Sequence, residues 1–378
     1  MMRLHPGRAL GARVLGDAWF ADAERPNVAG TSSPEGWGHI AVGREGLMRR
    51  ALVWLSVGIV GVSPVARASQ APPAAQSSTP LAWAYPVNPP ASPPGTASPA
   101  SADAKRQLDG SAATFTQAEL RDLFNVADWH PDNHPPMPDV VVHGRRPDVR
   151  ACGYCHLPNG QGRPENSSLA GLPAAYIAQQ MADFRNGLRE SAEPRMGPPA
   201  LMLTIGKATT PDESTIAADY FASFAYKPWI RVVETAEVPK TRVQGSMYVP
   251  IEGGGAEPIG QRIVETPEHL GRTELRDSAS GFVAYVPPGS VARGRALVST
   301  GGSGRTVACG TCHGADLKGL GPVPPLAGRS PSYLARQLWD LKTGHRRGPW
   351  AALMAAAVND LTPADIVDIG AYTASLAP

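Results

Sequence analysis

The chain has 378 residues, which is enough for two compact domains and the linkers between them. Its 35 Lys and Arg residues almost balance 33 Asp and Glu residues, so the formal net charge is +2. A charge this close to zero excludes the basic footprint of a nucleic-acid-binding protein. The chain contains four cysteines in two pairs, with none left over for a disulfide or a lipid anchor.

Residues 48–68 have the three parts of a secretory signal peptide. A basic Met48-Arg49-Arg50 precedes an apolar run from Ala51 to Val62, and Ala66-Arg67-Ala68 provides a small-x-small cleavage site. The run is too short to span a bilayer, and a buried helix would not need the three parts in this order. We therefore expect export to the periplasm. Residues 1–47 have no periodicity and are expected to be a non-native or disordered extension.

The next segment, 69–110, is dominated by Ala, Pro and Ser, a composition that predicts an extended tether without a core. Order is expected from residue 111 onward. Thr116 and Glu119 form a capping-box pattern that predicts the start of a short helix.

An internal repeat organises the remainder of the chain. The triplet Cys152, Cys155 and His156 recurs 157 residues later as Cys309, Cys312 and His313. The offset falls to 152 after Arg189 and Arg346, which indicates a five-residue deletion in one loop. Further equivalent positions are Tyr176 and Tyr333, Ile177 and Leu334, Met181 and Leu338, Phe184 and Leu341, Met202 and Met354, Thr210 and Thr362, and Tyr220 and Tyr372.

This repeat predicts an all-α fold with two tandem domains, 111–226 and 286–378, each made of helices around one motif. A Thr-Pro pair, Thr210-Pro211 and Thr362-Pro363, predicts a capped last helix in each domain. Residues 227–285 differ in character, with possible short strands at 230–233 and 282–286 among Gly- and Pro-bearing turns. We expect them to form an extended connector crossing the surface of both domains.

Each Cys-x-x-Cys-His motif indicates covalent attachment of a c-type haem. The thiols of Cys152 and Cys155, and of Cys309 and Cys312, lie one helical turn apart and can form thioethers with the two vinyl groups. His156 and His313 follow at once and are the expected axial ligands of the iron. A zinc ribbon would need its cysteine pairs far closer in sequence, and a redox dithiol would need a βαβ context.

The second axial ligand is expected to be a methionine, because a thioether raises the reduction potential and suits electron transfer. Met202 and Met354 are the methionines at equivalent places in the two repeats, each eight residues before a capping threonine. Met196 is the rival in the first repeat. Met137 and Met181 are expected to be core residues.

Histidine could replace methionine at either iron, and one supporting contact can also be predicted. His130, His134, His143 and His345 are the candidates, but we expect all four to be exposed loop residues.

The proximal imidazole should donate its second ring N–H to a carbonyl, and Pro324 is placed to provide one for His313. Ser167 occupies the equivalent place in the first repeat, and we expect that contact to differ.

At these positions the chain resembles the dihaem cytochrome c4 family, of the class I cytochrome c fold. In the second repeat the matching pattern runs from Cys309 to Gly314, then through 324–328, Tyr333, 337–338, Gly344, Met354, 361–362, 365–366 and 371–372. The first repeat matches more loosely. The resemblance covers residues 137–226 and 290–378, and it implies a periplasmic shuttle, soluble or membrane-associated, that passes single electrons from a respiratory donor to an acceptor.

The chain departs from this family in two places. About sixty residues separate the repeats where the family has a short linker, and the segment 111–136 is additional. Contact between the haems is therefore left open, and the additions could serve a dedicated redox partner such as a dehydrogenase.

The sequence thus predicts an electron carrier with two covalently bound haem c groups, rather than an enzyme. A dihaem peroxidase is the leading alternative, although it would need one displaceable distal ligand. A haem subunit fixed in a dehydrogenase complex is the second alternative.

Overall fold

The computed structural model describes residues 79–90 and 104–378. The chain divides into two compact units, residues 1–71 and 72–378, and all described residues belong to the second unit. The predicted extension 1–47 and signal peptide 48–68 lie outside the described residues. Within residues 79–90 and 104–378, no helix is long and apolar enough to cross a membrane.

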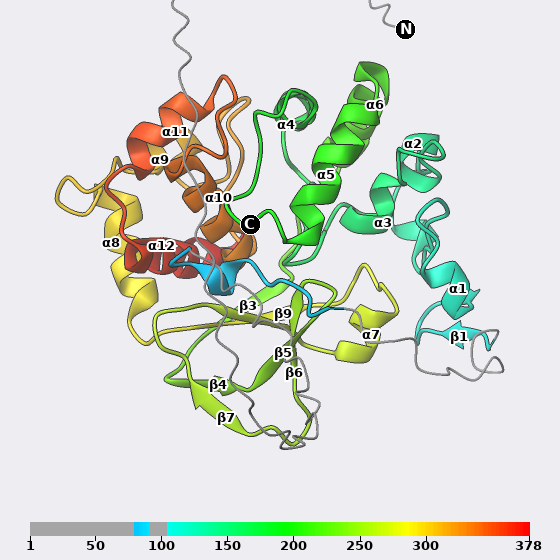
Figure 1. The fold of residues 1–378 in the computed structure, drawn as a ribbon, viewed down its shortest axis with the longest axis horizontal. Coiled ribbons are helices and arrows are strands. Elements are labelled where there is room, and N and C mark those ends of the chain that lie inside the picture. Colours follow the sequence, from blue (N-terminus) through cyan, green and yellow to red (C-terminus); the bar gives the residue numbers. More distant parts are fainter. Residues whose placement is uncertain (1–78, 91–103) are drawn as a thin grey trace, which may run out of the picture. The chain divides into compact units, whose positions relative to one another are not determined.

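The helices repeat at the spacing that the sequence predicts. The motif helix α3 (Cys152–His156) is followed by α4 (Ala174–Arg185), α5 (Gly197–Ala208) and α6 (Pro211–Ala222). Their counterparts are α9 (Gly310–His313), α10 (Pro331–Lys342), α11 (Ala351–Val358) and α12 (Pro363–Ser375). A further helix, α8 (Ser290–Thr300), opens the second set and packs beside α12 (Figure 1). We call residues 137–226 and 290–378 the first and second repeat.

The last helix of each repeat begins at the predicted cap. Thr210 accepts a hydrogen bond from the backbone N–H of Glu213, and Thr362 accepts one from that of Asp365. The carboxylates of Glu213 and Asp365 in turn accept hydrogen bonds from the backbone N–H groups of Thr210 and Thr362, which completes a capping box in each repeat. The predicted box at Thr116 and Glu119 is also present and begins α1 (Gln117–Leu120).

Replacing Thr362 by alanine is expected to destabilise the chain by about 1 kcal/mol, the typical contribution of an N-cap. The first turn of α12 would lose the acceptor for the Asp365 N–H. Denaturant unfolding measures the loss. Thr362→Ser keeps the hydroxyl and should restore most of the stability, so equal losses in both variants would contradict the capping argument.

The connector is not extended, and this corrects the all-α prediction. Its strands are β3 (Ile230–Glu234), β4 (Glu237–Pro239), β5 (Thr241–Gln244), β6 (Met247–Pro250), β7 (Ala256–Pro258), β8 (Val264–Pro267) and β9 (Phe282–Val286), with helix α7 (Leu270–Glu274) between β8 and β9. β9 lies between β3, which is parallel to it, and β8, which is antiparallel (Figure 1). β5 pairs with β6 and β4 with β7, so the connector folds on itself.

A parallel pair needs a long crossover between its strands, and this explains the length of the connector. The strands predicted at 230–233 and 282–286 are confirmed as β3 and β9, but their pairing could not be read from the local pattern. Phe282, Val283, Ala284 and Val286 are all buried, as expected for a strand covered on both faces.

The segment before the first repeat is partly ordered. Residues 79–90, here called the strap, carry a short 3-10 helix (Ala82–Ala84), and Leu81, Ala84 and Tyr85 are buried against the second repeat. The sequence predicts only a tether here. Four of these twelve residues are buried, the fourth being Pro86, and so few positions do not show in the composition of 69–110 as a whole. Residues 104–136 add a small two-stranded sheet, β1 (Arg106–Gln107) with β2 (Thr114–Phe115).

The remaining short elements precede the first motif. They are a 3-10 turn (Pro131–Asn133) and helix α2 (Asp139–Val142). α2 packs on α3, since Val140, Val141 and Val149 belong to the core cluster that includes Cys152 at its edge. The first motif is therefore supported from its N-terminal side.

Candidate functional site

His156 is the last residue of α3, and its side chain is buried. Its Nδ1 lies 2.8 Å from the carbonyl oxygen of Ser167, and because a carbonyl can only accept, Nδ1 carries the proton and donates. This bond fixes the ring and leaves Nε2 as the basic nitrogen available to a metal. Burial lowers the pKa of His156, which keeps the imidazole in the neutral form that ligation requires.

His313 repeats this arrangement at the end of α9. Its Nδ1 donates to the carbonyl oxygen of Pro324, also at 2.8 Å, which confirms the predicted contact. Burial lowers the pKa of His313 as well. The expectation that the first repeat would differ is wrong. The acceptor is a backbone carbonyl, so the change from proline to Ser167 leaves the contact unchanged.

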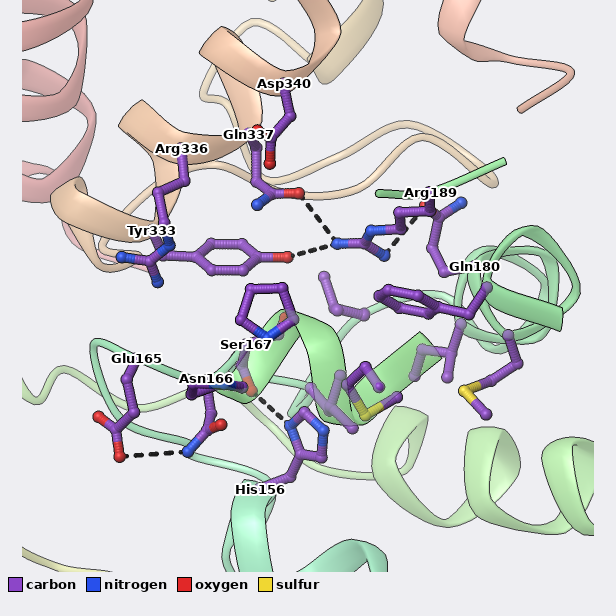
Figure 2. Close-up of a pocket in the computed structure, with 18 of the residues that line it drawn as sticks. His156, Glu165, Asn166, Ser167, Gln180, Arg189, Tyr333, Arg336, Gln337 and Asp340 are labelled. Carbon is purple, nitrogen blue, oxygen red and sulfur yellow. Dashed lines mark hydrogen bonds between the residues drawn. The ribbon is translucent and has the colours of Figure 1, made fainter. Parts of the chain in front are cut away.

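A cavity of about 100 Å³ opens beside His156 (Figure 2). Its walls combine apolar side chains from α4 and α5 with polar groups at one side. Met202 lines the same cavity as His156, and so does Met181, which the sequence predicts to be a core residue. The counterpart of Met181 in the second repeat is Leu338, so the repeat spacing, and not the cavity, favours Met202 as the ligand. The apolar wall includes Leu169, Leu172, Ile177, Met181, Phe184 and Pro199.

The rival methionine lies elsewhere. Met196 is completely buried in a hydrophobic cluster with residues of the second repeat and the strap, such as Leu341 and Tyr85. It does not line the cavity beside His156 among the described residues. The spacing between the repeats, which favours Met202, therefore agrees with the packing.

Met354 lies on α11 and is half-buried against the core of the second repeat. The same cluster has Cys309 and Leu338 at its edge, so the thioether of Met354 and the second motif border one apolar region. Met202 and Met354 occupy equivalent helices, α5 and α11.

The four histidines considered as rivals do not line the cavity at His156. His130 contacts Asp277 and His134 contacts Asp128, at 2.9 and 3.0 Å. His345 contacts the hydroxyl of Thr343. All three lie in loops, but they are not all exposed, since the side chain of His134 is only 3% exposed.

None of the four cysteines, all of which lie in the described residues, takes part in a disulfide. Burial raises the pKa of Cys152 to about 12 and that of Cys309 to about 11. A redox dithiol needs a lowered pKa on its attacking cysteine, so these values count against a thioredoxin-like centre. Among residues 79–90 and 104–378, no three His, Cys, Asp or Glu side chains are grouped so that they could hold a metal ion.

A polar cluster that sequence reasoning missed joins the two repeats. Arg189 donates to Gln180, Tyr333 and Gln337, at 3.0, 2.8 and 3.0 Å (Figure 2). Arg346 donates to Gln337, Gln180 and Tyr176, at 3.1, 2.8 and 3.4 Å. The backbones of Arg189 and Arg346 also pair with each other as an antiparallel bridge.

The members of this cluster are related by the repeat offset of 157: Arg189 with Arg346, Gln180 with Gln337, and Tyr176 with Tyr333. Each side of the contact is therefore the counterpart of the other, as at a two-fold interface. The offset was the available signal, but it does not say that equivalent residues meet. The two repeats are in direct contact despite the long connector.

The cluster carries positive charge that its own hydrogen bonds do not neutralise. All the acceptors named above are neutral oxygens. Burial by itself would raise the pKa of Tyr333, but the charges of Arg189 and Arg346 outweigh it and the pKa is lowered. Arg189 and Arg336 line the cavity at His156 together with the acidic residues Glu165, Glu190 and Asp340, so charges of both signs border it.

These residues fit a covalently attached haem. The motif supplies two thiols and an imidazole with a free Nε2, and the cavity supplies an apolar space with a thioether at its wall. The haem propionates are carboxylates, for which Arg189 and Arg336 in the cavity wall would be partners.

Comparisons with known proteins agree with this fit. No family model matches the chain. Cytochrome c-554(548) of Halomonas halodenitrificans is 43% identical over 68 residues, 18% of this chain and 82% of that protein. Cytochrome c4 of Pseudomonas aeruginosa is 39% identical over 75 residues, 20% of this chain and 36% of that protein. A thiosulfate dehydrogenase electron acceptor of Thiomonas intermedia is 24% identical over 61% of this chain and 80% of its own.

The aligned stretch thus spans about a third of the cytochrome c4 but most of cytochrome c-554(548). Together with the repeated motif, these relatives show that haem c is bound covalently and that the protein is of the electron-transfer class. The chain belongs to the cytochrome c4-like dihaem class I c-type cytochromes.

Proposed function

We propose that this protein is a periplasmic carrier that passes single electrons between a respiratory donor and an acceptor. His156 and Met202 hold the first iron, and His313 and Met354 hold the second. The observation that carries the proposal is the cavity bordered by both His156 and Met202, with Nδ1 of the histidine already engaged. A neutral imidazole and a thioether close the coordination shell, which suits electron transfer rather than substrate binding.

The haem supplies the reversible one-electron chemistry when bound, and the chain does the rest. The Ser167 and Pro324 carbonyls fix the two imidazoles. The apolar wall keeps water from the first haem. Arg189 and Arg346 lie between the repeats, where their positive charges would attract the propionates of a bound haem.

The donor is proposed to be a dehydrogenase. One relative is named as the electron acceptor of thiosulfate dehydrogenase, and it aligns with 61% of this chain. A fixed subunit of such a complex would use the same two sites and would differ only in remaining bound to its partner. The equivalent methionines count against a peroxidase, because that reaction needs an open or displaceable ligand at one iron.

The test is a haem count with the far-red spectrum of the oxidised protein, after export from a host that matures c-type haem. We expect two haems per chain. The methionine–iron charge-transfer band should have the intensity expected when both irons are bound by methionine. A band that is halved or missing would mean that one iron has another ligand. Turnover of hydrogen peroxide with a reduced donor would then favour the peroxidase.

A further inference from the structure

The loop that orients the first axial histidine is held by the second repeat. Residues 164–170 contain Ser167, whose carbonyl accepts from His156. Arg329 donates to the carbonyl oxygens of Ser168 and Ala170, at 2.9 and 3.0 Å. Arg336 donates to the carbonyl oxygen of Pro164. Arg329 precedes α10 and Arg336 lies on it. Two buried guanidiniums of the second repeat therefore bind the loop on both sides of Ser167.

The strap helps to hold one of these arginines. Arg336 also donates to the carbonyl oxygen of Ala84, at 2.8 Å. The Tyr85 hydroxyl contacts the next turn of α10, where it donates to a carboxylate oxygen of Asp340 at 2.8 Å. Arg336 and Asp340 both line the cavity at His156 (Figure 2). The wall of the first site is therefore completed by the second repeat, and the strap contacts two of the residues that complete it.

The first repeat has no arginines at the positions equivalent to Arg329 and Arg336. Subtracting the offset of 157 from Arg329 and Arg336 gives Leu172 and Gln179, neither of which is charged. Asp340 has an aspartate, Asp183, as its counterpart, and the polar cluster of Arg189 and Arg346 is shared equally. The two buried arginines are thus an asymmetry in an otherwise matched interface.

Both arginines are almost inaccessible to solvent, at 4% exposed for Arg329 and 3% for Arg336. A positive charge buried near a haem favours the ferrous state, because reduction removes one positive charge from the iron. The same guanidiniums fix the position of the Ser167 carbonyl, which sets the orientation of the imidazole. Charge and geometry therefore both act at the first site, where Arg336 and the carboxylate of Asp340 line the cavity.

We propose that Arg329 and Arg336 are positioning residues through which the second repeat tunes the first haem: both clamp the loop 164–170 behind His156, and Arg336 adds a buried positive charge at the wall of its cavity. The inference rests on the proposed function, since it takes His156 as the first axial ligand. The two arginines should raise the reduction potential of the first haem relative to that of the second.

The test replaces each arginine by the residue that the other repeat has at that place. In Arg336→Gln and Arg329→Leu, the reduction equilibrium of the first haem should shift toward the ferric state by about tenfold, equivalent to about 59 mV for one electron. The second haem should keep its potential. Potentiometric titration gives both values, and the second haem is assigned with Met354→Ala. Electron paramagnetic resonance of the first ferric haem should also change, which reports the orientation of the imidazole.

Arg347→Gln is the matched control. Arg347 is another arginine of the second repeat that donates to a carbonyl of the first, that of Gly187 at 2.9 Å, but it does not touch the loop 164–170. It should leave both potentials unchanged. Equal shifts in the control, equal shifts of both haems, or no shift in either variant would overturn the inference.

The lysine variants cover the case in which loss of a buried charge prevents folding. Arg336→Lys and Arg329→Lys keep the charge but cannot make both bonds, so the resonance of the first haem should change while its potential changes less. An unchanged resonance would overturn the clamp. A variant that still contains two reducible haems supports the proposed electron carrier, whatever happens to the potential of the first haem. Failure of this inference can therefore be told apart from failure of the proposed function.

Discussion

Replacing Met354 by alanine is expected to open the second iron while the haem stays covalently bound through Cys309 and Cys312. The potential of that haem should fall by on the order of 0.1 V, a fraction of the range of about 0.8 V that axial ligands cover. The far-red charge-transfer band should lose about half its intensity. The haem content, measured on the denatured protein, should remain two per chain.

Met202→Ala is the matched experiment in the first repeat, where the methionine lines the cavity at His156. It should remove the other half of the band. Met196→Leu is the control, because Met196 is buried in a hydrophobic cluster away from that cavity. A lost band in Met196→Leu would assign the first ligand to Met196, and an unchanged band in both variants would assign it to Met181, which lines the same cavity.

Replacing Arg189 by methionine is expected to destabilise the chain by about 3 kcal/mol. The change leaves the buried oxygens of Gln180, Tyr333 and Gln337 short of a donor, and breaking a buried charged network typically costs this much. Denaturant unfolding of the full chain measures the loss. Arg295→Met, on the exposed part of α8, is the control and should lie within about 0.5 kcal/mol of the unchanged protein.

Arg346→Met should have a similar effect, because Arg346 is the repeat counterpart and shares Gln180 and Gln337 with Arg189. Since both arginines serve the same acceptors, the double variant should lose less than the sum of the two single losses. Strictly additive losses would mean that the two guanidiniums act independently. The cluster would then not be the joint between the repeats.

Local patterns predicted the parts of this fold that depend on few neighbouring residues. The Cys-x-x-Cys-His motifs form the short helices α3 and α9, and Thr210 and Thr362 cap α6 and α12 as expected. The contact between His313 and Pro324 was also predictable, because only eleven residues separate them. In such cases the chain itself brings the groups together.

The connector shows where this reasoning fails. β3 and β9 were each visible as apolar segments, but their parallel pairing joins residues about fifty positions apart. The strap was hidden for a similar reason. Leu81 and Tyr85 are ordered by α10 and its neighbours, more than two hundred residues away, and nothing in the surrounding Pro- and Ala-rich sequence indicates that.

The sequence by itself determined the haem type, the tandem repeat and the equivalence of Met202 and Met354, because each depends on spacing along the chain. Only the tertiary structure decided that the repeats meet at Arg189 and Arg346, and that Arg329 and Arg336 hold the loop behind His156. A repeat offset identifies which residues are alike, but it contains no information about which of them touch. That depends on how the connector and the strap fold, and their contacts are long-range.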